Sequence, residues 1–600
     1  MNLSRNKKLN IGITSQLRRL WVQVQSKQRL QVVVLVFLMF GASLSEVLSI
    51  GAVIPFLGVL TAPDVIYDAD WFEPIKIVLE ISSPERMIPI VTLGFIISIL
   101  ISGSMRVCLL WMQNSLGHKV GSNISSSVFE KTINQPYKVH IKRNSSEILA
   151  AISTKCNIVV YQTIMPVLVI VSSLLISIFL FFALAIINIQ LVIYSICGFA
   201  VIYFTIVLST RTKISNEGKI ISLEQDRVLK IVQEGLGGIR DIIIDNNQEF
   251  YVNEFKKSDY PLKKAQATIQ IIGGIPRYLV ESLAIVMMVF FAYSMLAFDA
   301  GIASVVPTIG AFALGAQRML PAIQQIYNNY AYLMGSKENL NDVLQLLEQD
   351  IIKKSVISKS DKLTFQEKIT LENISFQYDL ANKHILQSVD ISILKGQKIG
   401  IIGQSGGGKS TLIDIIMGLL EPTSGKLIVD GVEINSSNSS AWQKNIAHVP
   451  QNIFLVDGSV AKNIVLSTPN NEVDSNLLKN SLRLAGLEKD VELWPLKSDT
   501  PVGEGGIGLS GGQRQRIGIA RALYKKASIL FLDEATSALD NATENSIIQG
   551  VSKMDASTTI FIIAHRITTL AFCDYIMEIK DGSISRIVSY EQLMSEQHAG

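Results

Sequence analysis

The chain has 600 residues, of which 48% are hydrophobic and 18% are charged. This length is too great for a single core, and the composition is apolar for a soluble protein. The net charge of +3 is too small to indicate a nucleic-acid partner, so none is expected. The four cysteines are scattered and show no metal-ligand spacing.

The first 30 residues carry seven Lys or Arg and no acid. A short basic segment of this kind is typical of the cytoplasmic side of a membrane protein. It contains no apolar region of the kind found in a signal peptide. We therefore expect residues 1–30 to form a cytoplasmic N-terminal segment.

Residues 31–333 contain six long apolar stretches, each reaching the ~20 residues needed to cross a bilayer. They are predicted to form a transmembrane domain of six helices, at 31–61, 87–113, 160–184, 187–209, 274–298 and 302–333. The long polar connections 114–159 and 210–273 are expected in the cytoplasm. Breaks at Gln135-Pro136 and Gly237-Gly238 predict short crosswise helices within these connections.

The outer segment 70–81 shows apolar residues at helical spacing, including Trp71, Phe72 and Leu79. Acidic residues and one lysine take the opposite face. We predict an amphipathic helix on the membrane surface. The pattern is equally compatible with a helix that packs against the rest of the protein.

Three arginines, Arg106, Arg277 and Arg318, lie inside apolar stretches. Counting from the outer ends places them at similar depths, roughly 26 to 32 Å. A charge in the bilayer is costly, so each should face a cavity or a partner. Guanidinium groups bind phosphate through paired donors, which suits a pyrophosphate headgroup. The alternative is structural pairing, with Glu281 for Arg277 or with the intramembrane acid Glu46.

Residues 334–364 form a charged connector, expected to be a linker, and residues 365–600 alternate between strand-like and helix-like patterns. Within this α/β region, the apolar run 399–402 is followed by a glycine-rich loop and a helical pattern. That order is the context of a P-loop, which binds nucleotide phosphates through backbone N–H groups and a helix N-terminus. The expected nucleotide-binding residues here are Gly403, Ser405, Gly406, Gly407, Gly408, Lys409, Ser410 and Thr411.

Lys409 is expected to bridge the β- and γ-phosphates, and the Ser410 hydroxyl to hold Mg²⁺. The apolar strand 528–532 ends in Asp533-Glu534. Asp533 would hold Mg²⁺ through water, and Glu534 would polarise the attacking water. A nucleotide and Mg²⁺ are therefore the expected substrate and cofactor.

Three further residues sit where strand-like runs begin or end. Tyr378 follows a strand and offers a ring for stacking on adenine. Gln451 offers a side-chain carbonyl to Mg²⁺ and water. His565, at the end of the last apolar run, is placed to contact the γ-phosphate. Each signal is weak alone, because such residues are more often structural.

Ser510, Gly511, Gly512 and Gln513 open another helix, whose free N–H groups form a second anion site. One P-loop already holds the phosphates from one side. A second phosphate site on the same domain is therefore predicted to contact a nucleotide bound to a partner copy. We expect a homodimer for this reason.

Together these motifs resemble the ABC transporter family. Residues 403–410 resemble its Walker A motif, 509–513 its signature, and 529–540 its Walker B motif with the D-loop, which adds Asp540. Six spans before one nucleotide-binding domain resemble an exporter-type half-transporter. The resemblance implies a membrane all-α domain fused to an α/β P-loop domain, in a bacterial plasma membrane with the nucleotide-binding domain in the cytoplasm. One departure is Gly505, where the family usually has a basic residue.

Three shorter patterns, at 275–281, 316–321 and 135–147, resemble the lipid-linked oligosaccharide flippases of bacterial protein N-glycosylation. This resemblance implies ATP-driven flipping of a polyprenyl-pyrophosphate glycan, with membrane lipid as a further partner. It also implies that the outer helix 70–81 engages the lipid tail. The alternative is a lipid A or multidrug exporter. A soluble ATPase of the same family is excluded by the six spans, and the intact Glu534 disfavours a gated channel.

Overall fold

The computed structural model describes residues 12–61, 63–68, 73, 77, 83–187, 189–297, 302–349, 363–378, 384–466, 473–535, 541–552, 555–564 and 566–599. The chain divides into two compact units, and each is described by itself. The first unit is Met1–Asn134 with Arg143–Asp350, and the second is Gln135–Lys142 with Ile351–Gly600.

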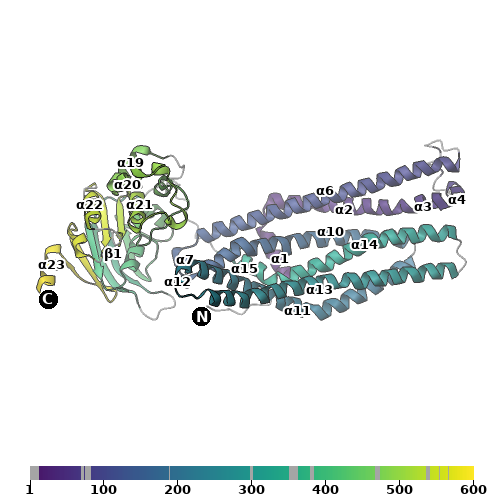
Figure 1. The fold of residues 1–600 in the computed structure, drawn as a ribbon, viewed down its shortest axis with the longest axis horizontal. Helices are drawn as coiled ribbons and strands as arrows, with labels where there is room; N and C mark the ends of the chain where they lie inside the picture. Colours follow the sequence, from purple (N-terminus) through teal and green to yellow (C-terminus); the bar gives the residue numbers. More distant parts are fainter. Residues whose placement is uncertain are drawn as a thin grey trace. The chain divides into compact units, whose positions relative to one another are not determined.

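The first unit is built from long helices that run side by side (Figure 1). Neighbouring pairs include α2 with α6, α10 with α14, and α11 with α13. The long helices are α2 (Ser26–Gly51), α6 (Pro84–Ile133), α10 (Met165–Ile187), α11 (Ile189–Gly237), α13 (Gln248–Ala297) and α14 (Ile302–Gly335). The shorter segments are α1 (Ile13–Gln23), α3 (Val53–Thr61), α4 (Pro63–Tyr67), α8 (Ser145–Ala150), η2 (Ala151–Lys155), α9 (Cys156–Val159), η3 (Val160–Ile164), α12 (Ile239–Ile244) and α15 (Lys337–Leu347).

Five stretches of the described residues are helical, long and apolar enough to cross a membrane. They run over Ser26–Thr61, Pro84–Ile133, Ser145–Ile186, Val192–Gly237 and Gln248–Phe290. The sixth predicted stretch, 302–333, falls on α14. Large apolar side chains such as Phe37 and Phe290 are more than two thirds exposed on these helices. Outward apolar surface is what lipid-facing helices require.

The predicted short helices are present as α7 (Tyr137–Lys142) and α12, each following the break that the sequence shows. Helix α7 groups with the second unit. Of the predicted outer helix 70–81, only Glu73 and Ile77 are among the described residues. Its role therefore stays a prediction.

Part of the predicted linker 334–364 is a packed helix. Leu340, Val343 and Leu344 of α15 are fully buried in the core of the first unit. The same helix is held by Lys155, whose ammonium contacts carboxylates of Asp342 on α15 and Asp226 on α11, each at 2.8 Å. Apolar spacing at 340, 343, 344 and 347 is the signal for this packing.

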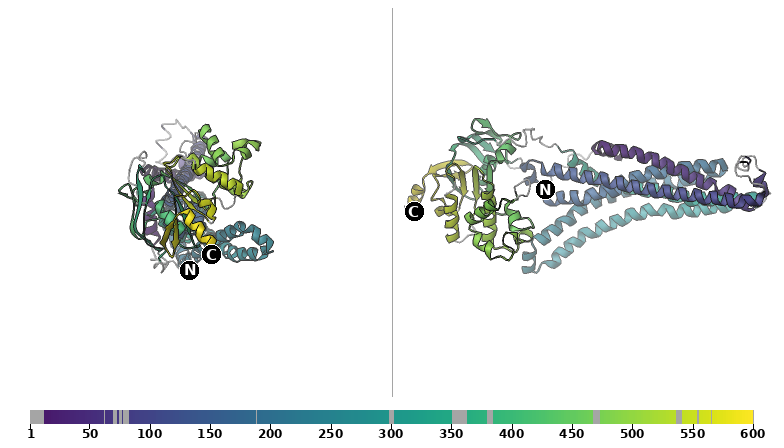
Figure 2. Two further views of the ribbon diagram at one scale, coloured as in Figure 1. Left: turned by 90° about the vertical axis from the view of Figure 1, so that its left-hand side faces the viewer. Right: turned by 90° about the horizontal axis from the view of Figure 1, so that it is seen from above.

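The second unit contains two sheets, seen from two further directions in Figure 2. An antiparallel sheet has the order β2-β1-β4-β5, and a mainly parallel sheet has the order β10-β9-β3-β8-β7-β6. The first sheet is formed by β1 (Lys368–Phe376), β2 (Leu386–Leu394), β4 (Ser424–Val429) and β5 (Val432–Glu433). The second is formed by β3 (Lys398–Gly403), β6 (Ile446–Val449), β7 (Ile529–Asp533), β8 (Thr559–Ile563), β9 (Tyr575–Lys580) and β10 (Ser583–Val588).

Strands β7 and β8 are almost wholly buried, as expected for central strands of a sheet covered on both faces. Phe531 and Phe561 are paired across these two strands, and their rings stack with centroids 4.6 Å apart. Helices and turns of the unit are α16 (Lys409–Ile416), α17 (Ser439–Gln443), α18 (Val460–Ile464), α19 (Ser475–Leu484), α20 (Glu488–Leu493), η4 (Lys497–Asp499), η5 (Glu504–Gly506), α21 (Gly511–Tyr524), α22 (Asn541–Ser552), η6 (Ile567–Leu570) and α23 (Tyr590–Ala599).

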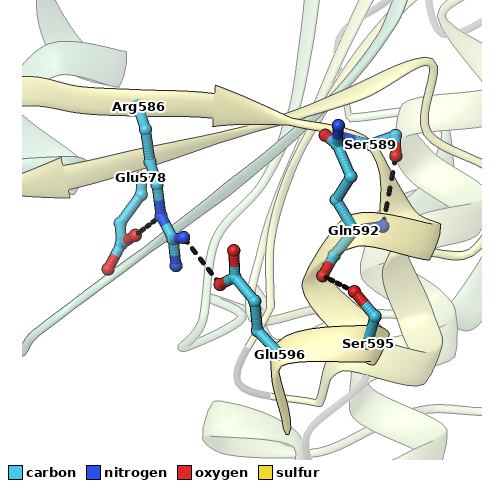
Figure 3. A network of polar contacts seen from close by, with 6 residues as sticks. All are labelled: Glu578, Arg586, Ser589, Gln592, Ser595 and Glu596. Carbon is cyan, nitrogen blue, oxygen red and sulfur yellow. Dashed lines mark hydrogen bonds and ion pairs between the residues drawn. The ribbon is translucent and has the colours of Figure 1, made fainter. Parts of the chain in front are cut away.

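The last helix is fastened to the sheet edge by a small polar network (Figure 3). Arg586 on β10 donates to Glu578 on β9 and to Glu596 on α23, at 2.5 and 2.6 Å. Ser589 and Gln592 exchange hydrogen bonds at the start of α23, which satisfies two backbone N–H groups there. The network is partly exposed, so it positions the helix more than it stabilises the unit.

Candidate functional site

The glycine-rich loop lies at the carboxyl end of β3, the usual place for a ligand in a parallel sheet. Gly403 and Gly408 have φ of 145° and 102°. A Cβ at Gly403 would collide with the carbonyl oxygen of Ile579, and one at Gly408 would lie 2.9 Å from that of Ile385. Only glycine fits both positions, because the loop must turn and pass close to neighbouring backbone.

The side chain of Lys409 folds back onto the loop that precedes it. Its Nζ donates to the carbonyl oxygens of Gly403 and Gln404, at 2.8 and 2.9 Å. It also begins α16, so Ser410 and Thr411 stand in the first turn, where backbone N–H groups are free for an anion. The predicted loop residues 403–411 are thus arranged as one turn that can surround a phosphate.

Two neighbouring parallel strands bring the next predicted residues together. Strands β6 and β7 pair through Val449 and Leu532, so Gln451 and Glu534 both follow carboxyl ends at one sheet edge. The Gln451 amide nitrogen donates to a carboxylate oxygen of Glu534 at 2.6 Å. Glu534 has φ of 51°, a backbone region that L-residues rarely adopt and that concentrates at functional sites.

Acidic groups crowd this edge. Burial, and then the charge of Glu534, raises the pKa of Asp533, while Lys409 lowers it. Burial, and then the charge of Asp533, raises the pKa of Asp414 on α16 to about 6. Carboxylates that disfavour each other's charge are the donor set that a divalent cation satisfies. Asp533, the Ser410 hydroxyl and the Gln451 side chain offer oxygen donors of the kind that Mg²⁺ prefers.

Sequence reasoning missed Asp414, whose signal was an acid inside the apolar run of α16. It also missed Tyr137 of α7, which belongs to the same unit. Burial, and then the charges of Asp414 and Tyr378, raises the pKa of Tyr137. These three residues therefore lie near one another. Tyr378 itself packs edge-on against Phe376, with ring centroids 4.9 Å apart.

The turn 510–513 is a reciprocal helix cap. Ser510 Oγ accepts from the Gln513 backbone N–H at 3.2 Å, and Gln513 Oε1 accepts from the Ser510 N–H at 3.0 Å. The Gln513 amide and Arg516 both donate to Asp490, which anchors the start of α21. The cap leaves Gly511 and Gly512 in the first turn, where an anion can approach the helix closely.

Two predicted site residues, Asp540 and His565, lie outside the described residues. Their proposed roles stay predictions.

The three membrane arginines have carboxylate partners. Glu46 on α2 is almost fully buried, and Arg318 Nη1 on α14 contacts its Oε1 at 2.5 Å. Arg106 Nη1 on α6 lies 3.6 Å from the same oxygen, and Ser102 donates to the other. Two guanidinium groups thus share one carboxylate across three helices. Half-exposed Arg106 keeps the more accessible charge.

Arg277 does not join this cluster. Its Nε contacts Glu281 at 2.8 Å, one turn along α13, and both side chains are exposed. The pairing alternative holds for Arg277 in this structure. The sequence named Glu46 only as a possible partner, because the depth along a helix does not tell which helices are neighbours.

Models of known protein families match residues in both halves of the chain. Residues 386–537 match the family described as ABC transporter, and residues 70–314 match the family described as ABC transporter transmembrane region. A solved structure described as a bacterial Atm1-family ABC exporter with ATP bound has the same fold. Its TM-score is 0.76 at 19% identity, over 95% of this chain and 96% of the other.

The curated relatives align with a smaller share of this chain than the solved structure does. The chain is 31% identical over 398 residues to the heterocyst differentiation ATP-binding protein HepA of Nostoc sp., covering 65% of this chain and 63% of the relative. It is 29% identical over 384 residues to the ATP-dependent lipid A-core flippase of Paraburkholderia xenovorans, covering 61% of each. The aligned parts span less than two thirds of these relatives. With its transmembrane region and nucleotide-binding domain both matched, the chain belongs to the ABC transporter family as an exporter-type half-transporter.

Proposed function

We propose that this chain couples ATP hydrolysis to the export of an amphipathic lipid that carries a phosphate-bearing headgroup. Two copies act as a homodimer in a bacterial plasma membrane, with the nucleotide-binding domains in the cytoplasm. The Glu46 cluster is the observation that supports an anionic headgroup. There, two arginines from α6 and α14 share one carboxylate of α2. The cluster has an excess of one positive charge, which suits an anionic group.

The nucleotide chemistry follows from the residues at the sheet edge. Lys409 and the loop N–H groups hold the phosphates, while Tyr378 stacks on the adenine. Ser410, Gln451 and Asp533 would hold Mg²⁺, which when bound would neutralise charge on the phosphoryl oxygens. Glu534 orients and polarises the attacking water, and Gln451 holds that carboxylate in place.

The partner copy completes each site. Ser510, Gly511, Gly512 and Gln513 of one copy approach the γ-phosphate held by the other copy. Donors on both sides of a transferring phosphoryl group stabilise its charge. Asp540 and His565 take part through the positions that the family resemblance gives them.

The substrate within this class is a polyprenyl-pyrophosphate-linked glycan. The three resembling patterns support it, two of which, 275–281 and 316–321, contain Arg277 and Arg318. Pyrophosphate is also a group that paired guanidinium donors fit well. A lipid A-core substrate is the second candidate, because a relative is named as a lipid A-core flippase. A neutral drug-like amphiphile would gain nothing from the charged cluster.

The test is lipid-stimulated ATPase activity of the full chain in nanodiscs. Polyprenyl pyrophosphate should stimulate hydrolysis, whereas the uncharged polyprenol should not. Arg318→Gln should abolish the stimulation but retain basal hydrolysis. The matched control is Glu281→Gln, which removes the partner of Arg277 on α13 and should leave the stimulation unchanged.

Stimulation by polyprenol equal to that by the pyrophosphate would contradict an anionic headgroup. Lipid A stimulating more strongly than the polyprenyl compound would favour the second candidate. Full stimulation in Arg318→Gln would remove this arginine from the headgroup site.

A further inference from the structure

An apolar cavity of about 260 Å³ lies between α1, α2, α6 and the η3–α10 segment of the first unit. It is separate from the Glu46 cluster, which lies deeper along the same helices. Its wall includes Trp21, Val32, Val36, Leu116, Val167 and Leu168.

The wall has almost no polar surface. Among the described side chains that line it, Thr163 contributes the one hydroxyl group. Apolar cavities of this kind stay dry and bind apolar guests, and one of about 150 Å³ already holds benzene. A larger cavity inside membrane-spanning helices therefore suits a longer hydrocarbon, which the bilayer supplies.

The cavity follows the direction of the first span. Its wall on α2 runs from Val32 to Met39, which lie 6 and 13 residues after Ser26. At 1.5 Å per residue this places the wall roughly 9 to 20 Å along the helix. A space that extends roughly 10 Å along a span can hold part of a hydrocarbon chain that lies parallel to the helix.

The end of the cavity near Ser26 is positively charged. Trp21 belongs to the wall and is 45% exposed, and the Arg29 guanidinium lies 5.8 Å from the centroid of its ring. Arg29 is fixed there by hydrogen bonds to the carbonyl oxygens of Trp21, Val22 and Val24. A Trp beside a cation is typical of the membrane interface, where the headgroups lie.

Other residues of the N-terminal segment add positive charge at this end of the cavity. The segment itself supplies no acidic residue to compensate that charge. The sequence contains no acidic residue before Glu46. Arg18 and Lys27 are exposed on either side of Trp21. Arg19 is neutralised by Glu348, which fastens α1 to the end of α15. An excess of exposed cations at a membrane interface attracts anionic lipids.

We propose that this cavity binds one acyl chain of an anionic glycerophospholipid, whose phosphate lies at the edge formed by Trp21 and Arg29. The lipid fills the space between α1 and the first three spans, and holds α1 against them. It is a structural lipid, not the transported one, so the site is independent of the proposed export function.

The test uses the full chain reconstituted in phosphatidylethanolamine vesicles containing phosphatidylglycerol with a diazirine on the acyl chain. After irradiation, peptides from residues 17–39 and 163–171 should carry several-fold more label than the lipid-exposed face around Val289 and Phe290 of α13. Label on the cavity peptides no higher than on that face would overturn the proposal.

A filling variant makes the test specific. Val167→Trp places a large ring in the cavity and should lower the labelling of residues 17–39 at least fivefold. The control, Ile178→Trp, changes an exposed residue elsewhere on α10 and should leave it unchanged. Where Val167→Trp does not fold, Val36→Phe on α2 fills the same space. Undiminished labelling in a folded filling variant would contradict the site, and equal labelling by the matching phosphatidylcholine probe would contradict the headgroup contact.

Discussion

Glu534 stands where β7 ends, in an unusual backbone conformation and in hydrogen-bond contact with Gln451. This placement suits a carboxylate that must be held against a water molecule. Glu534→Gln should keep ATP binding and lose turnover by a factor on the order of 10²–10⁴, because the base is removed while the shape is retained. ATP binding and single-turnover hydrolysis measure the two effects separately. Hydrolysis near the wild-type rate would show that another group activates the water.

The buried imidazole of His448 on β6 leads us to predict that stability depends on pH. Burial lowers its pKa, and its Nε2 has no hydrogen-bond partner among the described atoms. The unfolded state, with the ordinary value of about 6.5, then binds more protons than the folded state at mildly acidic pH. Stability contributed by neutral His448 is therefore present above pH ~6.5 and is lost as the pH falls below it.

Hydrogen exchange of the β6 and β7 amides in the full chain should reveal this loss. Protection, corrected for the intrinsic pH dependence of exchange, should be lower at pH 5.5 than at pH 7.5. His448→Leu should weaken that dependence, because no group is left to take up the proton. An unchanged pH dependence in the Leu variant would assign the effect to other residues.

The structure brings most residues of the predicted nucleotide site close together, because their order is local in sequence. The loop 403–411 needs its glycines, lysine and hydroxyl in one order, and neighbouring strands bring Gln451 to Glu534. The contacts of Glu46 with Arg106 and Arg318 were not predictable in the same way. They join three helices far apart in the chain, and periodicity alone does not say which helix faces which.

At the level of elements, α15 shows how a charged sequence can still be a packed helix. Its apolar face is buried, and Lys155 ties it to α11 through two carboxylates. The sequence suggested a linker here because the charged residues are conspicuous, whereas four apolar positions at helical spacing are easily overlooked.

Lys155→Met should destabilise the first unit by about 3 kcal/mol, because Asp226 and Asp342 lose their shared buried partner. The thermal unfolding midpoint of the full chain in detergent should fall by several degrees. Lys230→Met is the matched control, since Lys230 pairs with Glu234 at 3.6 Å on an exposed face and should change little. Equal midpoints for the two variants would mean that the buried pair contributes no more than the exposed one.

At the level of the whole molecule, the proposed anion site at Ser510 predicts a partner copy. Lys409→Ala and Ser510→Ala should each inactivate a homodimer. When the two variants are co-expressed, mixed dimers regain one intact site, made from Lys409 of one chain and Ser510 of the other. Roughly a quarter of the sites should then perform a single turnover. A mixture as inactive as the two separate variants, with mixed dimers shown to form, would contradict a shared site.

ATP-driven movement of a phosphate-bearing lipid is the centre of this account, and its most direct test is translocation in sealed proteoliposomes. A polyprenyl-pyrophosphate-linked glycan would be added with ATP, and its accessibility to an external glycan-cleaving enzyme followed with time. The account predicts ATP-dependent transfer to the protected leaflet by the wild-type chain and none by Glu534→Gln. Equal protection with and without ATP, or equal transfer by Glu534→Gln, would contradict it.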